Sequence, residues 1–277
     1  MVDSRDEIIT LLGSLTALLL VLRGGVVPML LAALSFFVAL LSKENAITFL
    51  GVVPLALYFF TKENAVGIIR KTAPLLGVAI LFLLIRGSIL GWSLGEPSME
   101  LMNNPFRKIE GGLWVDFSGA EKSATITYTL SKYAQLLVTP YPLTHDYYPR
   151  HVEIMNWGRW EVLLGLLLYL GLLVYGIWGL ARRQIGSFAV LVYLGTLSIV
   201  SNIVFPVGTN MSERFLFMPS IGYALLVAWL LSKFIENRRL ALGILGGYCL
   251  ILAVMTIMRN PAWSDNYTLF TTDIHTS

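Results

Sequence analysis

Long apolar stretches, separated by short polar ones, dominate the pattern along the chain. A helix that crosses a bilayer needs about 20 mostly apolar residues, and about 17 suffice. By this measure the sequence predicts about eight spans, of which the first three are short and depend on their polar ends to reach the interface. Their approximate ranges are 7–22, 26–42, 46–61, 73–90, 160–180, 186–206, 215–232 and 240–258. We therefore expect an all-α fold, a polytopic bundle of membrane helices.

One polar segment between the predicted spans, residues 91–159, is far longer than the others. Loops of this length are usually functional or fold independently. Apolar residues recur at helical spacing from Ser123 to Val138, which predicts an amphipathic helix on the membrane surface. Prolines after this helix keep residues 139–151 out of regular helix. This segment is therefore expected to be more than a connection between spans.

Composition supports the membrane assignment. Only 13% of the residues are charged and 56% are hydrophobic, whereas soluble domains carry roughly 25% charged residues. The single cysteine, Cys249, excludes an internal disulfide. The sequence contains no glycine-rich loop of the kind that binds phosphates. It also has no basic patch of the kind that binds nucleic acid.

Basic residues in the short loops predict the orientation. They all fall on one side if the spans alternate, and the positive-inside rule makes that side cytoplasmic. The long loop, most acidic residues and the tail from Arg259 then lie on the external face, which indicates a site open to that side. The basic loop residues are Arg23, Lys62, Arg70, Lys71, Arg182, Arg183, Lys233, Arg238 and Arg239.

The adjacent pair Glu213-Arg214, at the start of the seventh predicted span, is the strongest candidate for a site. Ionisable residues at membrane helices are functional hypotheses by default, and the planar guanidinium suits a phosphate or pyrophosphate. The alternative is an interfacial arginine with its neighbouring carboxylate. Arg86, in the outer part of the fourth span, is expected to extend to the interface.

Two further charged groups lie at the external ends of spans. Arg5-Asp6-Glu7 either contacts an anionic or sugar ligand, or simply begins a helix, where acidic residues complement the dipole. Lys43-Glu44 either joins two helices as an ion pair, or supplies a cation for a phosphate. The residues alone leave these alternatives open.

His145, Asp146 and His151 in the long loop suggest a metal site. No second carboxylate or histidine stands at a typical ligand spacing. We therefore expect no metal and no cofactor.

Five stretches together resemble one family. The most specific are Leu41–Thr48, with its Ser-Lys-Glu turn, and Ser212–Gly222, which matches the signature Glu-Arg-x-Leu-Tyr-x-Pro-Ser-x-Gly closely. Ser4–Ile8, Tyr133–Tyr147 and Trp263–Phe270 add weaker matches over the rest of the chain. The family is that of the transmembrane-and-tetratricopeptide-repeat O-mannosyltransferase-like proteins, which is similar to the GT-C membrane glycosyltransferases.

The resemblance implies a fold of GT-C type and transfer of a mannose-like sugar from a polyprenyl-phosphate donor to a protein hydroxyl. Such chemistry needs a carboxylate base and cations around the leaving phosphate. By resemblance, Arg214, Lys43 and Arg5 would contact the lipid phosphate or donor. Glu213, Asp6 and Glu7 would act in catalysis and around the acceptor. Glu44 and Asp146 are further site residues.

The resemblance also implies a domain organisation. Residues 1–258 would form the polytopic membrane domain, with the external loop 91–159, and residues 259–277 would lead to tetratricopeptide repeats. We expect a fragment that lacks the first spans and the repeats, has its catalytic base upstream of Met1, and is inactive alone. The sequence looks bacterial, which suggests the inner membrane with a periplasmic C-terminus. In a eukaryote the same segment would face the lumen of the endoplasmic reticulum. Membrane lipid, and a protein bound through the repeats, are the expected partners.

Two other classes fit the pattern. In the first, the spans merely anchor an exported repeat scaffold, and Glu213 and Arg214 are dispensable. The second, a flippase or polymerase for polyprenyl-linked sugars, would need polar residues deep inside the spans. These are few, with Ser198, Ser201 and Asn202 in the sixth span.

Overall fold

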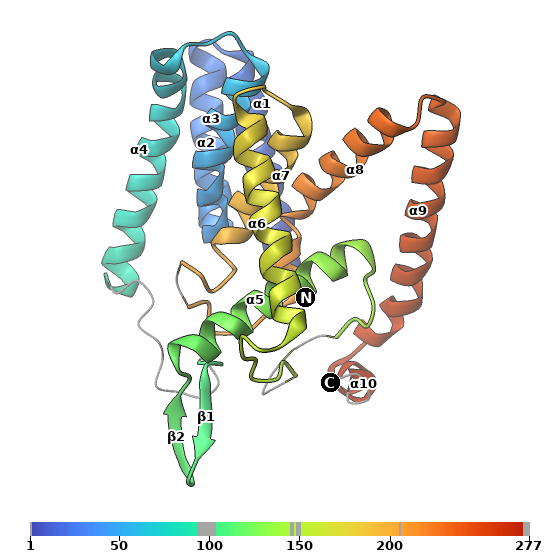
Figure 1. Ribbon diagram of the computed structural model, residues 1–277. Helices are drawn as coiled ribbons and strands as arrows, with labels where there is room; N and C mark the ends of the chain where they lie inside the picture. The colour runs from blue at the N-terminus through green and yellow to red at the C-terminus, as the bar shows by residue number, and fades with distance from the viewer. Residues whose placement is uncertain (1, 93–103, 145–146, 148–150, 205, 274–277) are drawn as a thin grey trace. The chain divides into compact units, whose positions relative to one another are not determined.

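The computed structural model describes residues 2–92, 104–144, 147, 151–204 and 206–273, and most of them lie in helices (Figure 1). The chain divides into two compact units. The first comprises Met1–Glu96, Leu173–Val207 and Phe217–Gly222, and the second comprises Pro97–Leu172, Gly208–Leu216 and Tyr223–Ser277.

The first unit is built on a helical hairpin of α1 (Val2–Arg23) and α2 (Val26–Ser42). Gly24 and Gly25 form the turn, with φ angles of 71° and 96°, which glycine adopts without the steric cost of a side chain. Close approach continues along the pair. A Cβ atom on Gly13 would lie 2.9 Å from the carbonyl oxygen of Ser35, whose hydroxyl donates to the Gly13 carbonyl at 2.9 Å.

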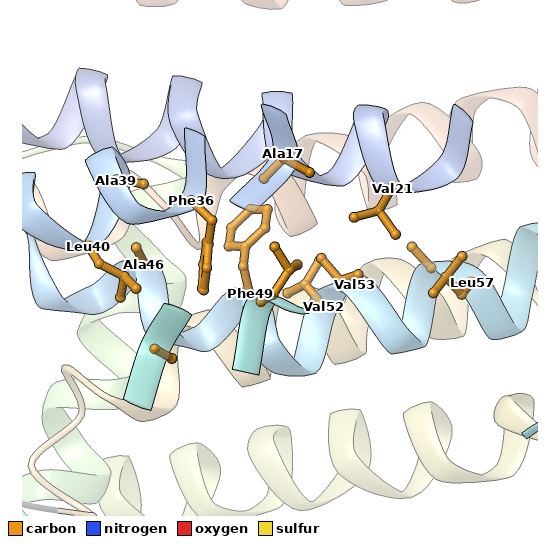
Figure 2. Packing of buried hydrophobic residues seen from close by; sticks show 14 of the residues in the cluster. Ala17, Val21, Phe36, Ala39, Leu40, Ala46, Phe49, Val52, Val53 and Leu57 are labelled. Atoms are coloured by element: carbon orange, nitrogen blue, oxygen red, sulfur yellow. The ribbon is translucent and has the colours of Figure 1, made fainter. Parts of the chain in front are cut away.

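The core of the first unit lies where α1, α2 and α3 (Phe49–Phe60) meet (Figure 2). The 3-10 helix η1 (Glu44–Thr48), α4 (Ala65–Leu90) and α7 (Ile185–Ser198) surround them. Lipid is as apolar as these side chains, so close packing holds such helices together more than removal from water does. The largest fully buried residues here include Val21, Phe36, Leu40, Phe49, Val53, Leu57 and Leu75.

Two predicted spans have wrong boundaries. α7 ends at Ser198 instead of residue 206, and α8 (Ser220–Phe234) begins at Ser220 instead of residue 215. Pro219 lacks an amide hydrogen and directly precedes Ser220, so it suits the start of α8 better than the interior of a helix that joins α8 to the segment after α7. The chain between α7 and α8 contains the short 3-10 helix η3 (Glu213–Leu216). Glu213 and Arg214 therefore stand in a loop before α8.

The second unit contains a β-hairpin that an all-α fold does not include. Strands β1 (Arg107–Glu110) and β2 (Leu113–Asp116) pair antiparallel. Gly111 and Gly112 join them with φ angles of 59° and 82°, and positive φ at both turn residues matches the twist of paired strands. The dipeptide Gly-Gly between two short alternating stretches was the signal for this hairpin.

A helix, α5 (Gly119–Val138), occupies the predicted segment of the long loop. It begins before Ser123 because Ser118 and Glu121 form a reciprocal capping box. The predicted apolar residues Ile126, Leu130 and Tyr133 are buried. Its place at a membrane surface stays a prediction.

The second unit also holds most of α6 (Trp160–Leu180) and α8, together with α9 (Arg238–Arg259), the 3-10 helix η4 (Asn260–Trp263) and α10 (Asn266–Asp273). Among the residues that the structure describes, three helices are long and apolar enough to cross a membrane: Ala65–Leu90, Trp160–Leu180 and Arg238–Trp263. Four other apolar helices are shorter. These helices indicate a membrane protein, and the count of about eight spans stays a prediction.

Gly222, at the start of α8, packs against the backbone of α7 in the first unit. A Cβ atom there would lie 2.5 Å from the amide nitrogen of Tyr193 and 2.7 Å from the carbonyl oxygen of Ala189. Backbone atoms cannot rotate away, so we expect Gly222→Ala to lower stability by about 1–3 kcal/mol. Thermal unfolding in lipid nanodiscs measures the change.

Gly195→Ala is the matched control, because a Cβ on this α7 residue meets nothing within 4 Å. Alanine also favours a helix over glycine by roughly 0.5–1 kcal/mol. Equal unfolding temperatures for the two variants would contradict the packing of Gly222 on α7.

Candidate functional site

A polar cluster of the first unit joins the start of α1 to the end of α2. The ammonium of Lys43 forms an ion pair with Oε1 of Glu7. Glu7 is 3% exposed, and its Oε2 accepts no hydrogen bond from any group in the described part of the chain. An unmatched buried acceptor costs about 1–3 kcal/mol, so a hydroxyl donor from a ligand would be stabilising here.

Glu44 takes a different partner from its neighbour. Its Oε1 lies 2.6 Å from Nε of Arg86 in α4, so the Ser-Lys-Glu turn is linked to α1 through Lys43 and to α4 through Glu44. Arg86 therefore does more than extend to the interface. Glu44 keeps 55% of its side chain exposed, and such pairs contribute only about 0–1 kcal/mol.

The rest of the Arg5-Asp6-Glu7 group is more open. Arg5 is exposed and Asp6 is half-buried in α1. Within the described residues, neither side chain makes a hydrogen bond or ion pair. Of the three, only Glu7 joins the cluster with Lys43.

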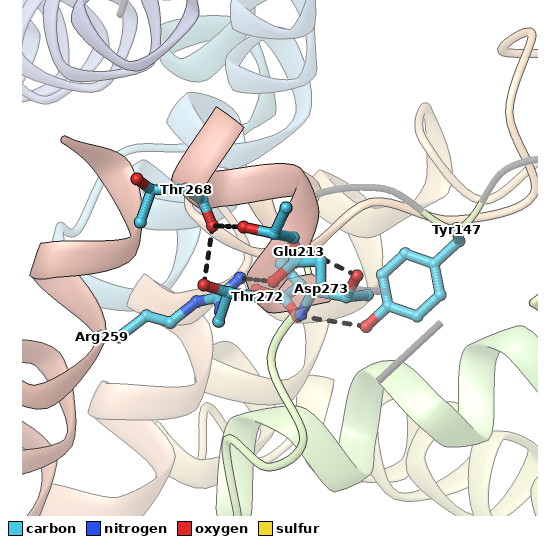
Figure 3. A network of polar contacts seen from close by, with 8 residues as sticks. Tyr147, Glu213, Arg259, Thr268, Thr272 and Asp273 are labelled. Carbon is cyan, nitrogen blue, oxygen red and sulfur yellow. Dashed lines mark hydrogen bonds and ion pairs between the residues drawn. The ribbon is translucent and has the colours of Figure 1, made fainter. Parts of the chain in front are cut away.

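The second unit holds the other candidate carboxylate, Glu213. Its Oε1 accepts hydrogen bonds from the amide of Thr144 at 2.7 Å and from the hydroxyl of Tyr147 at 3.1 Å (Figure 3). The hydroxyl of Tyr133 in α5 accepts a hydrogen bond of 3.0 Å from the amide of Ser212, the residue before Glu213. Both bonds to Glu213 reach one oxygen, and Oε2 accepts none from the residues described.

The Glu213-Arg214 pair does not act as a unit. Arg214 is exposed, and its guanidinium carbon lies 5.7 Å from the centre of the Phe215 ring. A 3-10 helix has three residues per turn, so adjacent side chains point about a third of a turn apart. The carboxylate and the guanidinium of the motif therefore face different surroundings.

Burial raises the pKa of the Glu213 carboxyl above its ordinary value. The hydrogen bonds from Thr144 and Tyr147 and the charge of Arg259 lower this pKa in part. The pKa of the Tyr147 phenol is raised, first by burial and then by the adjacent Glu213. A carboxylate with a raised pKa is a stronger base than an exposed one, which suits proton abstraction near neutral pH.

Two residues that sequence reasoning did not select complete this network. Arg259, at the end of α9, forms an ion pair of 2.5 Å with Asp273 of α10. The hydroxyl of Thr144 lies 3.5 Å from Oδ2 of Asp273, which links the pair to the loop around Glu213 (Figure 3). No motif marks Asp273, because its contacts come from residues far away in the chain.

A small cavity of about 140 Å³ borders the same loop. Tyr147 lines it, so one side chain connects the cavity to Glu213. Other lining side chains are Tyr128, Lys132, Gln135, Tyr141 and His151. The cavity is smaller than the roughly 300–1,000 Å³ that is common for ligand sites, and its lining combines aromatic and polar groups.

Only one of the three residues that suggested a metal site is described by the structure. His151 lies at the cavity, whereas His145 and Asp146 fall outside the described residues. Among the residues that are described, no three His, Cys, Asp or Glu side chains form a cluster suited to a metal ion.

The long apolar helices indicate an integral membrane protein. Its polar clusters, around Glu7 and around Glu213, lie at the ends of helices or in the loops between them. No family model and no solved structure matches the chain. It is 26% identical to "Protein O-mannosyl-transferase TMTC4" of Mus musculus over 265 residues, which cover 84% of this chain and 34% of that protein. The human TMTC4 protein is 25% identical over the same shares. Mouse TMTC3 is 31% identical over 54% of this chain and 17% of its own length.

The chain is thus similar to TMTC-type protein O-mannosyl-transferases along most of its length, which confirms the resemblance seen in its motifs. It spans about a third of the length of the TMTC4 proteins it matches.

The raised pKa of Glu213 predicts a pH dependence of stability. The folded state binds this proton more tightly than the unfolded chain does. The resulting stabilisation is complete below pH about 4.5 and is lost as the pH rises through the folded pKa. We expect the unfolding temperature of wild type, relative to Glu213→Gln, to fall from about pH 4 to about pH 8.

Glu121→Gln serves as a control of opposite sign. Lys108 and the cap at Ser118 lower the pKa of Glu121 to about 2, so its stabilisation is present above pH about 4.5 and is lost as the pH falls. Parallel pH curves for wild type and Glu213→Gln would show that Glu213 is not desolvated.

The Arg259–Asp273 pair predicts how firmly α10 is held. Removing one partner of a buried pair leaves a charge without compensation, at a cost of about 3–5 kcal/mol. Because α10 is short, we expect Asp273→Asn to release it locally and to speed amide exchange in residues 266–273 at least about tenfold. Asp265→Asn, just before the same helix, is the control, because asparagine also caps helices well. Unchanged exchange in Asp273→Asn would mean that other contacts hold α10.

Proposed function

We propose that this protein is the membrane part of a glycosyltransferase of GT-C type, which transfers a sugar from a polyprenyl-phosphate donor to a protein hydroxyl on the external face. One observation carries the proposal. Glu213, inside a motif shared with the transmembrane-and-tetratricopeptide-repeat proteins, is a desolvated carboxylate with a raised pKa beside a small polar cavity. The similarity to protein O-mannosyl-transferases over most of the chain supports it.

The proposal gives Glu213 the role of the base, in place of the carboxylate that the resemblance puts upstream of Met1. The acceptor oxygen forms a bond to the anomeric carbon, the bond from that carbon to the phosphate oxygen breaks, and the hydroxyl proton passes to a carboxylate. Thr144 and Tyr147 orient Glu213 through Oε1, which leaves Oε2 to receive the proton. A positioned base of this kind contributes about 10²–10⁴ in rate.

Cations are assigned to the leaving phosphate. Arg214 is exposed beside Glu213 in the chain, and its planar guanidinium suits two phosphate oxygens. Lys43 and Arg5 are the further donor contacts of the proposal, Glu7 and Asp6 act around the acceptor, and Glu44 is a further site residue. In this scheme Glu7 holds Lys43 in place, and its second oxygen receives a hydrogen bond from the acceptor.

The proposed setting is the bacterial inner membrane with the C-terminal segment in the periplasm, and a protein acceptor bound through tetratricopeptide repeats. Attachment of α10 by the Arg259–Asp273 pair also favours a second candidate, a membrane anchor for an exported scaffold. In that case the ion pair serves to fix the scaffold to the membrane helices. No observation favours the flippase, since Ser201 and Asn202 lie in a loop beyond α7 and not within a span.

Sugar transfer by variants of the protein tests the proposal. Membranes containing each variant receive a radiolabelled polyprenyl-phosphate sugar, and label in protein is counted. We expect Glu213→Gln to transfer about 10²–10⁴ times more slowly while still binding donor. Arg214→Ala should weaken donor binding and transfer together, because it removes a phosphate contact.

Glu110→Gln is the matched control, since Glu110 is exposed on β1 and pairs with Lys108, which is not a residue of the proposed site. If Glu213→Gln and Glu110→Gln transferred sugar at the same rate, at equal protein levels, Glu213 would not be the base. Wild type that neither binds donor nor transfers sugar would support the anchor instead.

A further inference from the structure

A second, larger cavity lies in the first unit, where the α1–α2 turn faces the start of α4. Its volume is about 560 Å³, within the range of roughly 300–1,000 Å³ that is common for ligand sites. One stripe of α2 lines it, formed by Val26, Met29, Leu30 and Ala33. This spacing puts all four side chains on one helical face, and Pro74 of α4 also lines the cavity. The wall of the cleft is therefore largely apolar.

The mouth of the cleft carries an excess of positive charge. Arg70 and Lys71 of α4 line it together with Glu63. Lys71 is already matched, because its Nζ lies 2.9 Å from Oε1 of Glu63. Arg70 is exposed and makes no ion pair with any residue that the structure describes. One guanidinium at the cleft is thus left for an anion.

The position of these groups suits a bilayer surface. α4 is one of the helices able to cross a membrane, and Arg70 and Lys71 lie in its first two turns. α2 begins at the same cleft, and Gly25 caps it without a side-chain hydrogen bond, so the positive end of its dipole adds to Arg70. The cleft is at the opposite end of the α1–α2 hairpin from the Glu7–Lys43 pair.

We propose that this cleft binds an anionic phospholipid, with the phosphate at Arg70 and an acyl chain along the apolar stripe of α2. Basic pockets between membrane helices are suited to such head groups, and the apolar stripe matches a chain that free phosphate lacks. None of the residues that line the cleft belongs to the clusters around Glu7 and Glu213, so the lipid proposal stands whether or not the protein transfers sugar.

Lipid binding to the full chain in detergent, followed by native mass spectrometry, tests the proposal. The probes are phosphatidylglycerol and phosphatidylcholine with identical acyl chains. We expect phosphatidylglycerol to bind at least about fivefold more tightly than phosphatidylcholine. Arg70→Gln should lower that affinity about fivefold. Glu63→Gln should raise it, because it removes the carboxylate that neutralises Lys71.

Lys62→Gln is the matched control, since it removes one exposed positive charge next to α4 without touching the cleft. It should change the affinity less than about twofold. Ala33→Phe fills the α2 stripe and should weaken binding of both lipids.

Three results would overturn the proposal. Equal binding of the two lipids would indicate apolar contact alone. Equal effects of Arg70→Gln and Lys62→Gln would indicate a general attraction to charge. Displacement of phosphatidylglycerol by inorganic phosphate would show that the head group alone occupies the cleft.

Discussion

Close packing of α1 against α2 is the constraint on which the first unit depends. In lipid, helices gain little from hiding apolar surface, so association needs backbones that approach closely. Gly13 permits this approach at Ser35, and Gly24 and Gly25 permit the reversal between the helices. The hairpin then brings Glu7 to Lys43 at one end. At its other end, it opens a cleft toward α4.

The second unit is organised around a desolvated carboxylate. Glu213 is stabilised by an amide and a phenol from the loop after α5. The same loop reaches Asp273, whose charge is matched by Arg259. Thr144 contacts both carboxylates, since its amide donates to Glu213 and its hydroxyl lies 3.5 Å from Oδ2 of Asp273. The network thus links the carboxylate to the segment after the last long helix.

Neighbours in the sequence proved poor guides to neighbours in space. Lys43 and Glu44 bind different helices, and Glu213 and Arg214 point to different surroundings. Sequence motifs identify which residue types are present, but the direction of each side chain depends on the backbone of a short turn or 3-10 helix. Asp273 illustrates the opposite case, since it carries no motif, yet it pairs with Arg259 and contacts Thr144.

The apolar pattern by itself determined that the protein is helical and lies in a membrane, because apolar length and charge spacing are properties of the local chain. The motifs also determined its relatives, and the Gly-Gly pairs at residues 24–25 and 111–112 marked two turns. Only the tertiary structure decided which charges pair, where α7 and α8 end and begin, and that Glu213 is half-buried. Pairing and desolvation depend on segments separated by up to about 130 residues, as for Thr144 and Asp273, and no local pattern records such contacts.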